Sequence, residues 1–253
     1  GAEISKEVIG GREIVRRADL AMYTGKKRAS GTLSFYDADH AKAHIAKLQA
    51  VTEVRDAIQS GRLFAAYQPI VDLLTQKVIG VEALMRVRAR DGSQLTARNL
   101  MPAIGDPHVS REIGHTMVAN ICMDCADITR RITTLRSISF NANEADLLSQ
   151  DYAPSLLDKL KKVGIDPASL TLEVTETMLM VSDNDMARQA LSDLRSAGMR
   201  IALDDFGTGY SSLTHLRDFP IDIVKLDRSF VRVINTDHQS RLIVQAMIAM
   251  AQS

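Results

Sequence analysis

Acidic and amide residues, with one lysine, stand at the ends of apolar runs in the middle and later parts of this sequence. The set is Glu82, Asn141, Glu173, Glu176, Asp204, Asp205, Lys225 and Asp227. Carboxylates brought together repel one another unless a cation neutralises them. Oxygen ligands suit Mg²⁺ or Mn²⁺ better than zinc, which prefers nitrogen and sulfur. The pattern predicts a site for a hard divalent cation, although any single acid in a strand is more often exposed or in a salt bridge.

The adjacent pair Asp204 and Asp205 suggests two ions, because one carboxylate can bridge both and its neighbour can hold the second. Two ions about 4 Å apart would clamp the attacking and leaving oxygens of a displacement at phosphorus. Lys225 could orient or deprotonate the attacking water, because burial beside cations lowers the pKa of a lysine. These residues favour a two-metal hydrolase.

The segment DDFGTGYSSL, residues 204–213, begins with the two acids and continues with two glycines and three Ser or Thr residues. It fits a loop that orders over a ligand. It fits equally well an ordinary strand-to-helix turn with Ser211 or Ser212 as the N-cap.

The acids must be positioned by strands, and six apolar runs of strand length follow residue 63. These runs cover 64–73, 77–87, 136–142, 169–176, 199–206 and 221–227. Only Leu74 to Gln76 join the first two, so these two strands must be antiparallel. Helical patterns separate the later runs and imply parallel neighbours, whose carboxyl ends converge at one mouth of a barrel. We expect an α/β fold, namely a TIM-like (β/α)8 barrel with one antiparallel strand. The barrel is expected to be truncated after the sixth strand.

Helical patterns precede the strands. Residues 12–23 predict a helix that ends in the Gly25-Lys26-Lys27 turn, and residues 32–36 predict a short strand. Residues 37–62 predict one long amphipathic helix that stops at Gly61 and serves as a linker or opening helix. A further apolar helix is expected at 241–251.

Composition limits the partners of the chain. Lys and Arg number 31 and Asp and Glu number 31, so no basic surface for a nucleic acid polymer is expected. No run approaches the roughly 18 apolar residues that span a bilayer. We expect a cytoplasmic segment without direct membrane insertion, and an anchor further upstream stays open.

Two other groups of residues could bind metal or react. Cys122 and Cys125 lie three apart in an apolar helical stretch, which favours core packing over a zinc or redox site. Asp106, His108 and His115 have irregular spacing, which favours a solvated loop over a metal site.

Several motifs resemble the EAL family of cyclic di-GMP phosphodiesterases from about residue 53 onward. They are YQPIV at 67–71, EALMR at 82–86, LEVTE at 172–176, DDFGTGYSSL at 204–213 and FPIDIVKLDRSFV at 219–231. In addition, residues 18–37 resemble the C-terminal tail of a GGDEF, or diguanylate cyclase, domain. The resemblance divides the chain into a GGDEF remnant at 1–36, a linker helix at 37–62 and an EAL domain at 63–253.

The resemblance implies hydrolysis of cyclic di-GMP to linear pGpG with two Mg²⁺ or Mn²⁺ ions. Glu82, Asn141, Glu173 and Asp204 would bind the first ion, and Asp204 with Asp205 the second. Lys225 would position the water, and Glu176 would hold the 207–213 loop, so Lys225, Asp205 and Glu176 form the catalytic group. Gln68 and Arg86 would contact the dinucleotide, since the planar fork of an arginine suits a phosphate.

The sequence departs from the family pattern in three places. Asn141 is followed by Ala142-Asn143, where an aliphatic residue and Ser are more usual, and the stretch from Thr96 lacks the family's first proline and its Ala-Glu pair. The glutamate-bearing seventh strand and the eighth strand do not occur before Ser253. We therefore expect the EAL domain here to lack its last two strands.

Two other readings compete with the enzyme. The nearer is a non-catalytic EAL-like receptor that binds cyclic di-GMP without cutting it, although receptor variants typically lose acids that this chain keeps. The other is a structural dimerisation domain that uses the helix at 241–251. For the enzyme we also expect a homodimer formed through residues 206–220.

Overall fold

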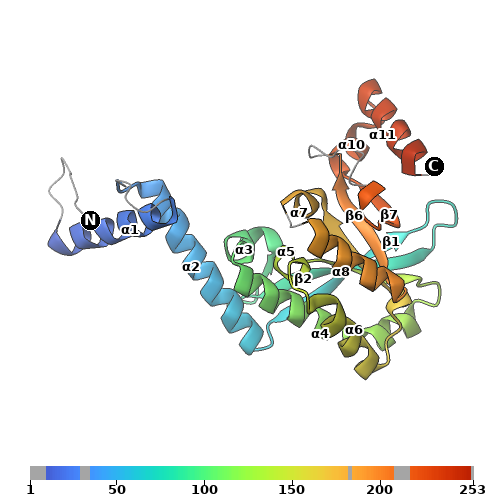
Figure 1. Ribbon diagram of the computed structural model, residues 1–253, viewed down its shortest axis with the longest axis horizontal. Helices are drawn as coiled ribbons and strands as arrows, with labels where there is room; N and C mark the ends of the chain where they lie inside the picture. Colours follow the sequence, from blue (N-terminus) through green and yellow to red (C-terminus); the bar gives the residue numbers. More distant parts are fainter. Residues whose placement is uncertain (1–9, 29–34, 182–183, 208–216, 252–253) are drawn as a thin grey trace.

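A mostly parallel sheet organises the protein (Figure 1). The computed structural model describes residues 10–28, 35–181, 184–207 and 217–251. The sheet order is β1-β2-β4-β5-β6-β7, and the short β3 pairs with β2. The strands are β1 Leu63–Val71, β2 Val78–Arg88, β3 Gln94–Thr96, β4 Ser137–Asn141, β5 Leu170–Thr175, β6 Arg200–Phe206 and β7 Ile223–Leu226. The six predicted strands and the α/β class are confirmed. Three-residue β3 is an addition, too short to produce a periodic signal in the sequence.

Helices precede the sheet, connect its parallel strands and follow β7. They are α1 Gly11–Arg28, α2 Ala38–Gln59, α3 Ala97–Ile104, α4 Pro107–Arg131, α5 Glu144–Leu147, α6 Tyr152–Val163, α7 Glu176–Val181, α8 Asn184–Ser196, α10 Arg228–Val233 and α11 His238–Ala251, with a 3₁₀ turn at Pro167–Ser169. Within the described ranges, no helix combines the length and apolar character needed to cross a lipid bilayer.

β1 and β2 form the predicted antiparallel hairpin, in which Val71 lies opposite Val78. The connection, residues 72–77, is longer than the three residues expected. Asp72 Oδ1 accepts hydrogen bonds from the backbone N and the Oγ1 of Thr75 at 2.7 and 2.8 Å, and Gln76 adopts a φ of 56°. Asp72 thus organises a turn that reverses the chain before β2 begins.

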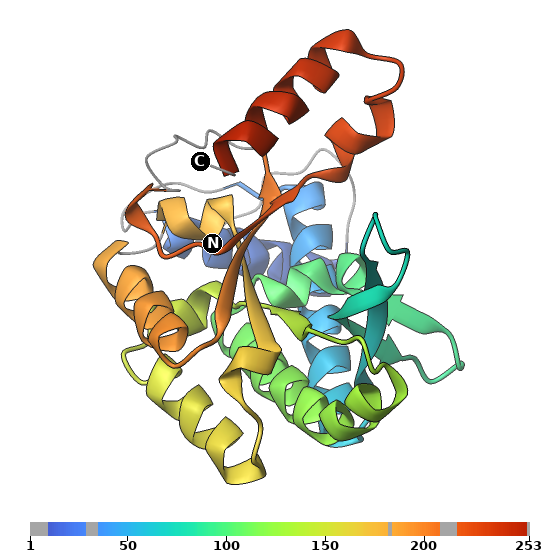
Figure 2. The same cartoon turned by 90° about the vertical axis from the view of Figure 1, so that its right-hand side faces the viewer.

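Alternation along the strands separates a helix-facing layer from a polar layer. In β5, Leu170, Leu172 and Val174 are buried in the core together with leucines of α6 and α8. Thr171 and Glu173 project to the opposite face, because successive side chains of a strand point to opposite sides. Figure 2 shows the sheet with helices packed along its outside. The polar face is therefore the one on which side chains from several strands can meet.

The N-terminal helices project away from the sheet (Figure 1). α1 continues to Arg28, so the predicted end at the Gly25 turn is wrong. A glycine in a helix costs only about 1 kcal/mol, and the basic residues that follow it favour a helix C-terminus. Of the strand predicted at 32–36, residues 32–34 lie outside the described residues, and Phe35 and Tyr36 are not in a strand.

The long opening helix is confirmed as α2, and Gly61 follows it with a φ of 66°. Its C-terminal half docks on the sheet domain through the buried side chains of Val54 and Ala57. Arg62, just beyond the helix, pairs with Glu53 at 2.8 Å and donates to the carbonyl of Arg88 at 2.6 Å. These contacts fix the entry into β1.

Candidate metal centre

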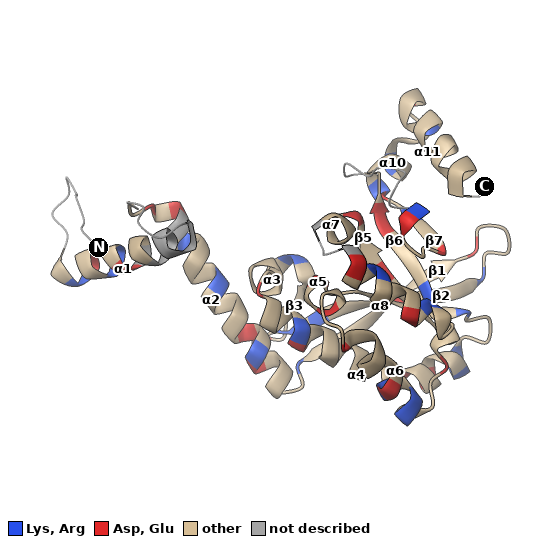
Figure 3. Ribbon diagram, in the orientation of Figure 1, with Lys and Arg blue, Asp and Glu red and all other residues tan. Residues whose placement is uncertain are grey.

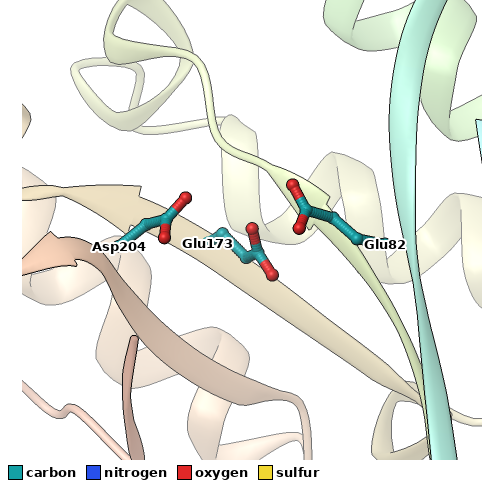
Figure 4. Close-up of side chains that lie close together, drawn as sticks. All are labelled: Glu82, Glu173 and Asp204. Carbon is teal, nitrogen blue, oxygen red and sulfur yellow. The ribbon is translucent and has the colours of Figure 1, made fainter. Parts of the chain in front are cut away.

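Four strands bring three carboxylates and one ammonium group together. Lys225 Nζ of β7 lies 2.5 Å from Glu173 Oε2 of β5, and 3.2 Å from both Glu82 Oε2 of β2 and Asp204 Oδ1 of β6. One oxygen from each of the three acids lies within 4.8 Å of the others. Figure 4 shows these three side chains pointing toward one another. We call Glu82, Glu173, Asp204 and Lys225 the carboxylate cluster.

Strand register places these residues on one face of the sheet, and the curvature of the sheet brings β7 back toward β2. Glu173 lies beside Ala202 in the parallel pairing of β5 with β6, and Asp204 is two residues further along, on the same face. Figure 3 shows acidic positions in red on the part of the sheet where β6 is labelled. The carboxyl ends of these strands therefore converge as the sequence pattern predicted.

Burial controls the charge of Glu173, whose side chain is 1% exposed. Desolvation raises its pKa to about 7, since removing a carboxylate from water disfavours the charged form and the attraction of Lys225 offsets this only in part. Its Oε1 atom is buried and accepts no hydrogen bond among the described residues. An unpartnered buried carboxylate oxygen is unfavourable, and a bound cation would satisfy it.

Lys225 responds to burial and to its neighbours in opposite directions. Burial lowers its pKa, but the hydrogen bond and charge of Glu173, followed by the charges of Asp204 and Glu82, outweigh burial and raise the pKa above the usual value. The direction is opposite to the one expected beside bound cations, because here three carboxylates surround the ammonium group. With all groups ionised, the cluster carries two more negative than positive charges, and the acids therefore fit a divalent cation.

Asn141 and Asp205 lie next to the carboxylate cluster without belonging to it. Asn141 is exposed at the end of β4, across from Glu173 in the parallel register. Asp205 has a φ of 54°, a left-handed backbone conformation that is rare for a non-glycine residue. Burial raises its pKa, and the charges of Asp204 and Asp227 act in the same direction. A strained backbone beside a cluster of acids is typical of a functional site.

Glu176 begins α7 and does not end β5, which corrects its expected place in a strand. Thr175 Oγ1 accepts a hydrogen bond from Met178 N at 3.4 Å and so favours the start of a helix there. Buried Glu176 accepts a hydrogen bond through Oε1 from Gly207 N at 2.9 Å. Glu176 therefore holds the first residue of the expected 207–213 loop, whereas residues 208–216, with both proposed N-caps and most of the proposed dimer segment, lie outside the described residues.

The two predicted substrate residues share the face of Glu82. Gln68 of β1 lies directly opposite Glu82 in the antiparallel register, and its side chain is exposed. Arg86 follows Glu82 by four residues in β2, an even spacing that keeps it on the same face. Its Nη1 donates to the carbonyl of Met85 at 2.8 Å. Both residues are therefore placed on the same face of the sheet as Glu82.

Comparison with protein families bears on the identity of the chain independently of the geometry of the site. The family model described as EAL domain matches residues 51–253. The chain belongs to the EAL domain family. This EAL domain is 34% identical to the signaling protein YkoW of Bacillus subtilis over 245 residues, which cover 97% of this chain and 30% of YkoW. It is 36% identical over 179 residues to the probable cyclic di-GMP phosphodiesterase PdeB of Escherichia coli, covering 70% of this chain and 34% of PdeB.

Solved structures share the fold of this EAL domain. The PaMucR phosphodiesterase, in complex with c-di-GMP, superposes with a TM-score of 0.73 at 29% identity and covers 81% of this chain and 82% of its own. The EAL enzyme Bd1971, in its cAMP and cyclic-di-GMP bound form, has a TM-score of 0.77 at 26% identity over 97% of this chain and 64% of its own. The EAL domain described here spans about a third of the length of the curated relatives it matches.

The other candidate groups have structural roles in this EAL domain. Asp106 caps α4, and its side chain accepts hydrogen bonds from the backbone of His108 and Val109. His108 and His115 therefore lie in a capped helix, and the predicted solvated loop is wrong. Cys122 and Cys125 are free, half-buried and packed against the core, as predicted. Sequence patterns missed the direct contact of Lys225 with all three acids, because it depends on strand order.

Proposed function

We propose that this EAL domain is a metal-dependent phosphodiesterase that hydrolyses one ester bond of cyclic di-GMP and releases linear pGpG. The observation that carries the proposal is the carboxylate cluster with its buried, unpartnered Glu173 Oε1. The names of the relatives add support, since PdeB is called a probable cyclic di-GMP phosphodiesterase and PaMucR a phosphodiesterase in complex with c-di-GMP. If this chain is part of a longer protein, we propose the same activity and the same ligand for that protein.

Four oxygen-bearing residues would hold the first Mg²⁺ or Mn²⁺ ion, namely Glu82, Asn141, Glu173 and Asp204. Asp204 and Asp205 would hold a second. When bound, such ions lower the pKa of water and stabilise the charge that develops on phosphoryl oxygens. The chain supplies hard oxygen ligands, which match the preference of these cations.

The remaining residues would position the substrate and the water. Lys225 Nζ lies among the three acids and would hold a water molecule by donating a hydrogen bond to it. Arg86 would bind a phosphate of the dinucleotide, because a guanidinium can donate two parallel hydrogen bonds to it. Gln68 would contact the same ligand from β1. Glu176, which binds the backbone of Gly207, would keep the following loop close to the bound ligand.

The proposal is tested by incubating the protein with cyclic di-GMP and Mg²⁺ and measuring pGpG. Asp204→Asn should reduce turnover by at least about 100-fold, because it removes a charged ligand shared by both proposed ions. Asp158→Asn is the matched control, since this exposed aspartate of α6 pairs only with Lys162 in the described structure. Turnover in the Asp204→Asn variant equal to that of wild type would contradict the proposal.

A receptor that binds cyclic di-GMP without cutting it is the second candidate. One observation favours it: Lys225 already lies within 3.2 Å of all three acids and supplies a positive charge where a cation would bind. A receptor should bind the dinucleotide with the same affinity with and without Mg²⁺ and form no pGpG. Metal-dependent turnover rejects this candidate.

The resemblance of residues 18–37 to a GGDEF tail gives a further proposal about organisation. In the structure, residues 18–28 form the end of α1 and α2 leads into the sheet domain. We propose that α1 belongs to an upstream GGDEF domain and that α2 connects the two domains. Thermal unfolding of residues 1–253, compared with that of a chain extended upstream, tests this arrangement, because α1 should gain stability in the extended chain.

A further inference from the structure

A cavity of about 220 Å³ lies between α4, α5 and α6, on the helix side of the sheet. We call it the α4–α6 cavity. Figure 1 shows α4 and α6 next to each other at the bottom of the molecule, with α5 above them. The walls include the apolar side chains of Val118, Phe140 and Leu156, and charged or polar residues surround them. None of the four members of the carboxylate cluster lines it, so this is a separate site.

A polar turn forms one wall of the α4–α6 cavity. Asn143 caps α5, and its Oδ1 accepts a hydrogen bond from Ala145 N at 3.0 Å. That bond fixes the amide orientation, because a backbone N–H needs an acceptor. The other end of the amide, Nδ2, is buried and has no hydrogen-bond partner among the described residues. A buried donor without a partner is unfavourable by roughly 1–3 kcal/mol, which a ligand oxygen would relieve.

The backbone of α4 leaves room for this polar turn. A Cβ atom on Gly114 would lie 3.0 Å from Asp146 Oδ2 and 3.9 Å from Asn143 Nδ2. A larger residue at this position would force the Asp146 carboxylate to shift by a few tenths of an ångström. The buried Asp146 is already paired, since its Oδ1 lies 3.3 Å from Arg111 Nε. The charges of His115 and Lys159 act on the same carboxylate, so three basic residues surround this one acid.

Among the other polar groups that line the α4–α6 cavity, hydrogen-bond donors exceed acidic acceptors. Lys159 and His115 line the α4–α6 cavity and form no ion pair or side-chain hydrogen bond within the described parts of the chain. The other acid of the lining, Asp151, is exposed at the rim. The inner part of the cavity thus offers a lysine, a histidine and a buried amide donor beside an apolar floor. This combination selects an anion that carries an apolar body.

The volume limits the size of that ligand. A cavity of about 150 Å³ lined by apolar side chains holds one benzene ring. The α4–α6 cavity, at about 220 Å³, has room for one ring and one anionic substituent. We propose that it binds a small organic anion, a single ring or an equally compact apolar body that bears one phosphate or carboxylate group.

The site also borders the proposed metal centre. Asn141, a proposed metal ligand, lines the α4–α6 cavity at the end of β4, two residues before Asn143. An anion held by Asn143 would therefore lie against the turn that carries Asn141. This consequence rests on the proposed function, whereas the binding of the anion does not.

Calorimetric titration of the full chain, without divalent cations or cyclic di-GMP, tests the binding. Phenyl phosphate and benzoate are the two anionic probes, inorganic phosphate lacks the ring, and benzyl alcohol lacks the charge. At least one ring-bearing anion should bind saturably with a stoichiometry of one. Equal affinity for benzyl alcohol or for inorganic phosphate would overturn the proposal, as would no saturable binding of either ring-bearing anion.

Three variants locate that binding. Lys159→Gln should weaken it about tenfold or more, because a charge-assisted hydrogen bond is lost. Asn143→Asp keeps an oxygen to cap α5 but replaces the buried donor with a carboxylate, and it should weaken binding at least as much. Lys161→Gln, an exposed position of the same helix, should leave the affinity unchanged. Circular dichroism checks that each variant is folded, and unchanged affinity in both folded cavity variants would place the binding elsewhere.

Discussion

Lys225 Nζ donates to Glu173 Oε2 at 2.5 Å, while the other oxygen of the same carboxylate, Oε1, is buried without a hydrogen-bond partner among the described residues. One carboxylate thus has one satisfied and one unsatisfied oxygen. The lysine compensates part of the charge of the cluster, and a ligand for the second oxygen would complete its coordination. This asymmetry leads to the predictions about Glu173 and Lys225.

Replacing Glu173 with Gln should weaken the binding of Mn²⁺ at the cluster. The amide keeps the size of the side chain but removes the negative charge and one hard oxygen ligand, so affinity should fall by at least about 10–100-fold. Titration calorimetry with Mn²⁺ measures the change. Asp158→Asn serves as the control for a lost surface charge, and Mn²⁺ binding by the Glu173→Gln variant at wild-type affinity would exclude Glu173 as a ligand.

The free energy of unfolding should carry a pH dependence that comes from Glu173. Its pKa is about 7 in the folded protein against an ordinary value of 4.5, so the folded state binds more protons between these two values. The contribution of Glu173 to stability is therefore fully present below pH 4.5 and is lost as pH rises through 7. Urea unfolding of metal-free protein from pH 4.5 to 8 measures this. The difference in stability between wild type and Glu173→Gln should shift in favour of the variant as pH rises; a constant difference would contradict the assignment.

Removing the ammonium group of Lys225 should make the stability of the protein depend more strongly on divalent cations. Lys225→Met leaves three acids without their shared partner, which should destabilise the metal-free protein by about 2–3 kcal/mol, less than a fully buried pair because the lysine is 27% exposed. Added Mg²⁺ should then raise the melting temperature of the variant more than that of wild type. Equal increases in both proteins would show that Lys225 and the cation do not compete for the same acids.

Gly207 should be far less tolerant of a side chain than Gly92, although both have positive φ angles of 98° and 84°. A Cβ at Gly207 would lie 2.5 Å from Met247 Cε and 2.9 Å from Phe230 Cε2, whereas one at Gly92 meets nothing within 4 Å. Gly92→Ala should cost about 1–2 kcal/mol for the backbone conformation alone, and Gly207→Ala clearly more.

Urea unfolding compares the two alanine variants, and pGpG formation is measured in parallel. Because Glu176 binds the backbone of Gly207, Gly207→Ala should also reduce turnover, whereas Gly92→Ala should not. Equal loss of stability in both variants would show that α10 and α11 move aside without cost.

From the sequence alone, the six long strands, the antiparallel first pair and the opening helix were predictable. Each of these depends on local periodicity or on the length of a connection, as for residues 37–62, where apolar spacing and Gly61 define a helix and its end. Local signals failed where they were weak or ambiguous. Glu176 stood in an apolar run but begins α7, because Thr175 can cap a helix, and Gly25 did not end α1.

Only the tertiary structure decided which of the acids meet. Glu82, Glu173 and Asp204 were predicted to converge, but their contact with Lys225 requires the strand order β2-β4-β5-β6-β7, a register that places all four on one face, and a sheet curved enough to bring β7 toward β2. The same register leaves Asn141 and Asp205 beside the cluster. The α4–α6 cavity had no sequence signal, since its lining comes from three helices and a strand end. Side-chain alternation is a local property of a strand, whereas distances between strands depend on how the whole chain packs, and for that reason the chemistry of the site became visible only in three dimensions.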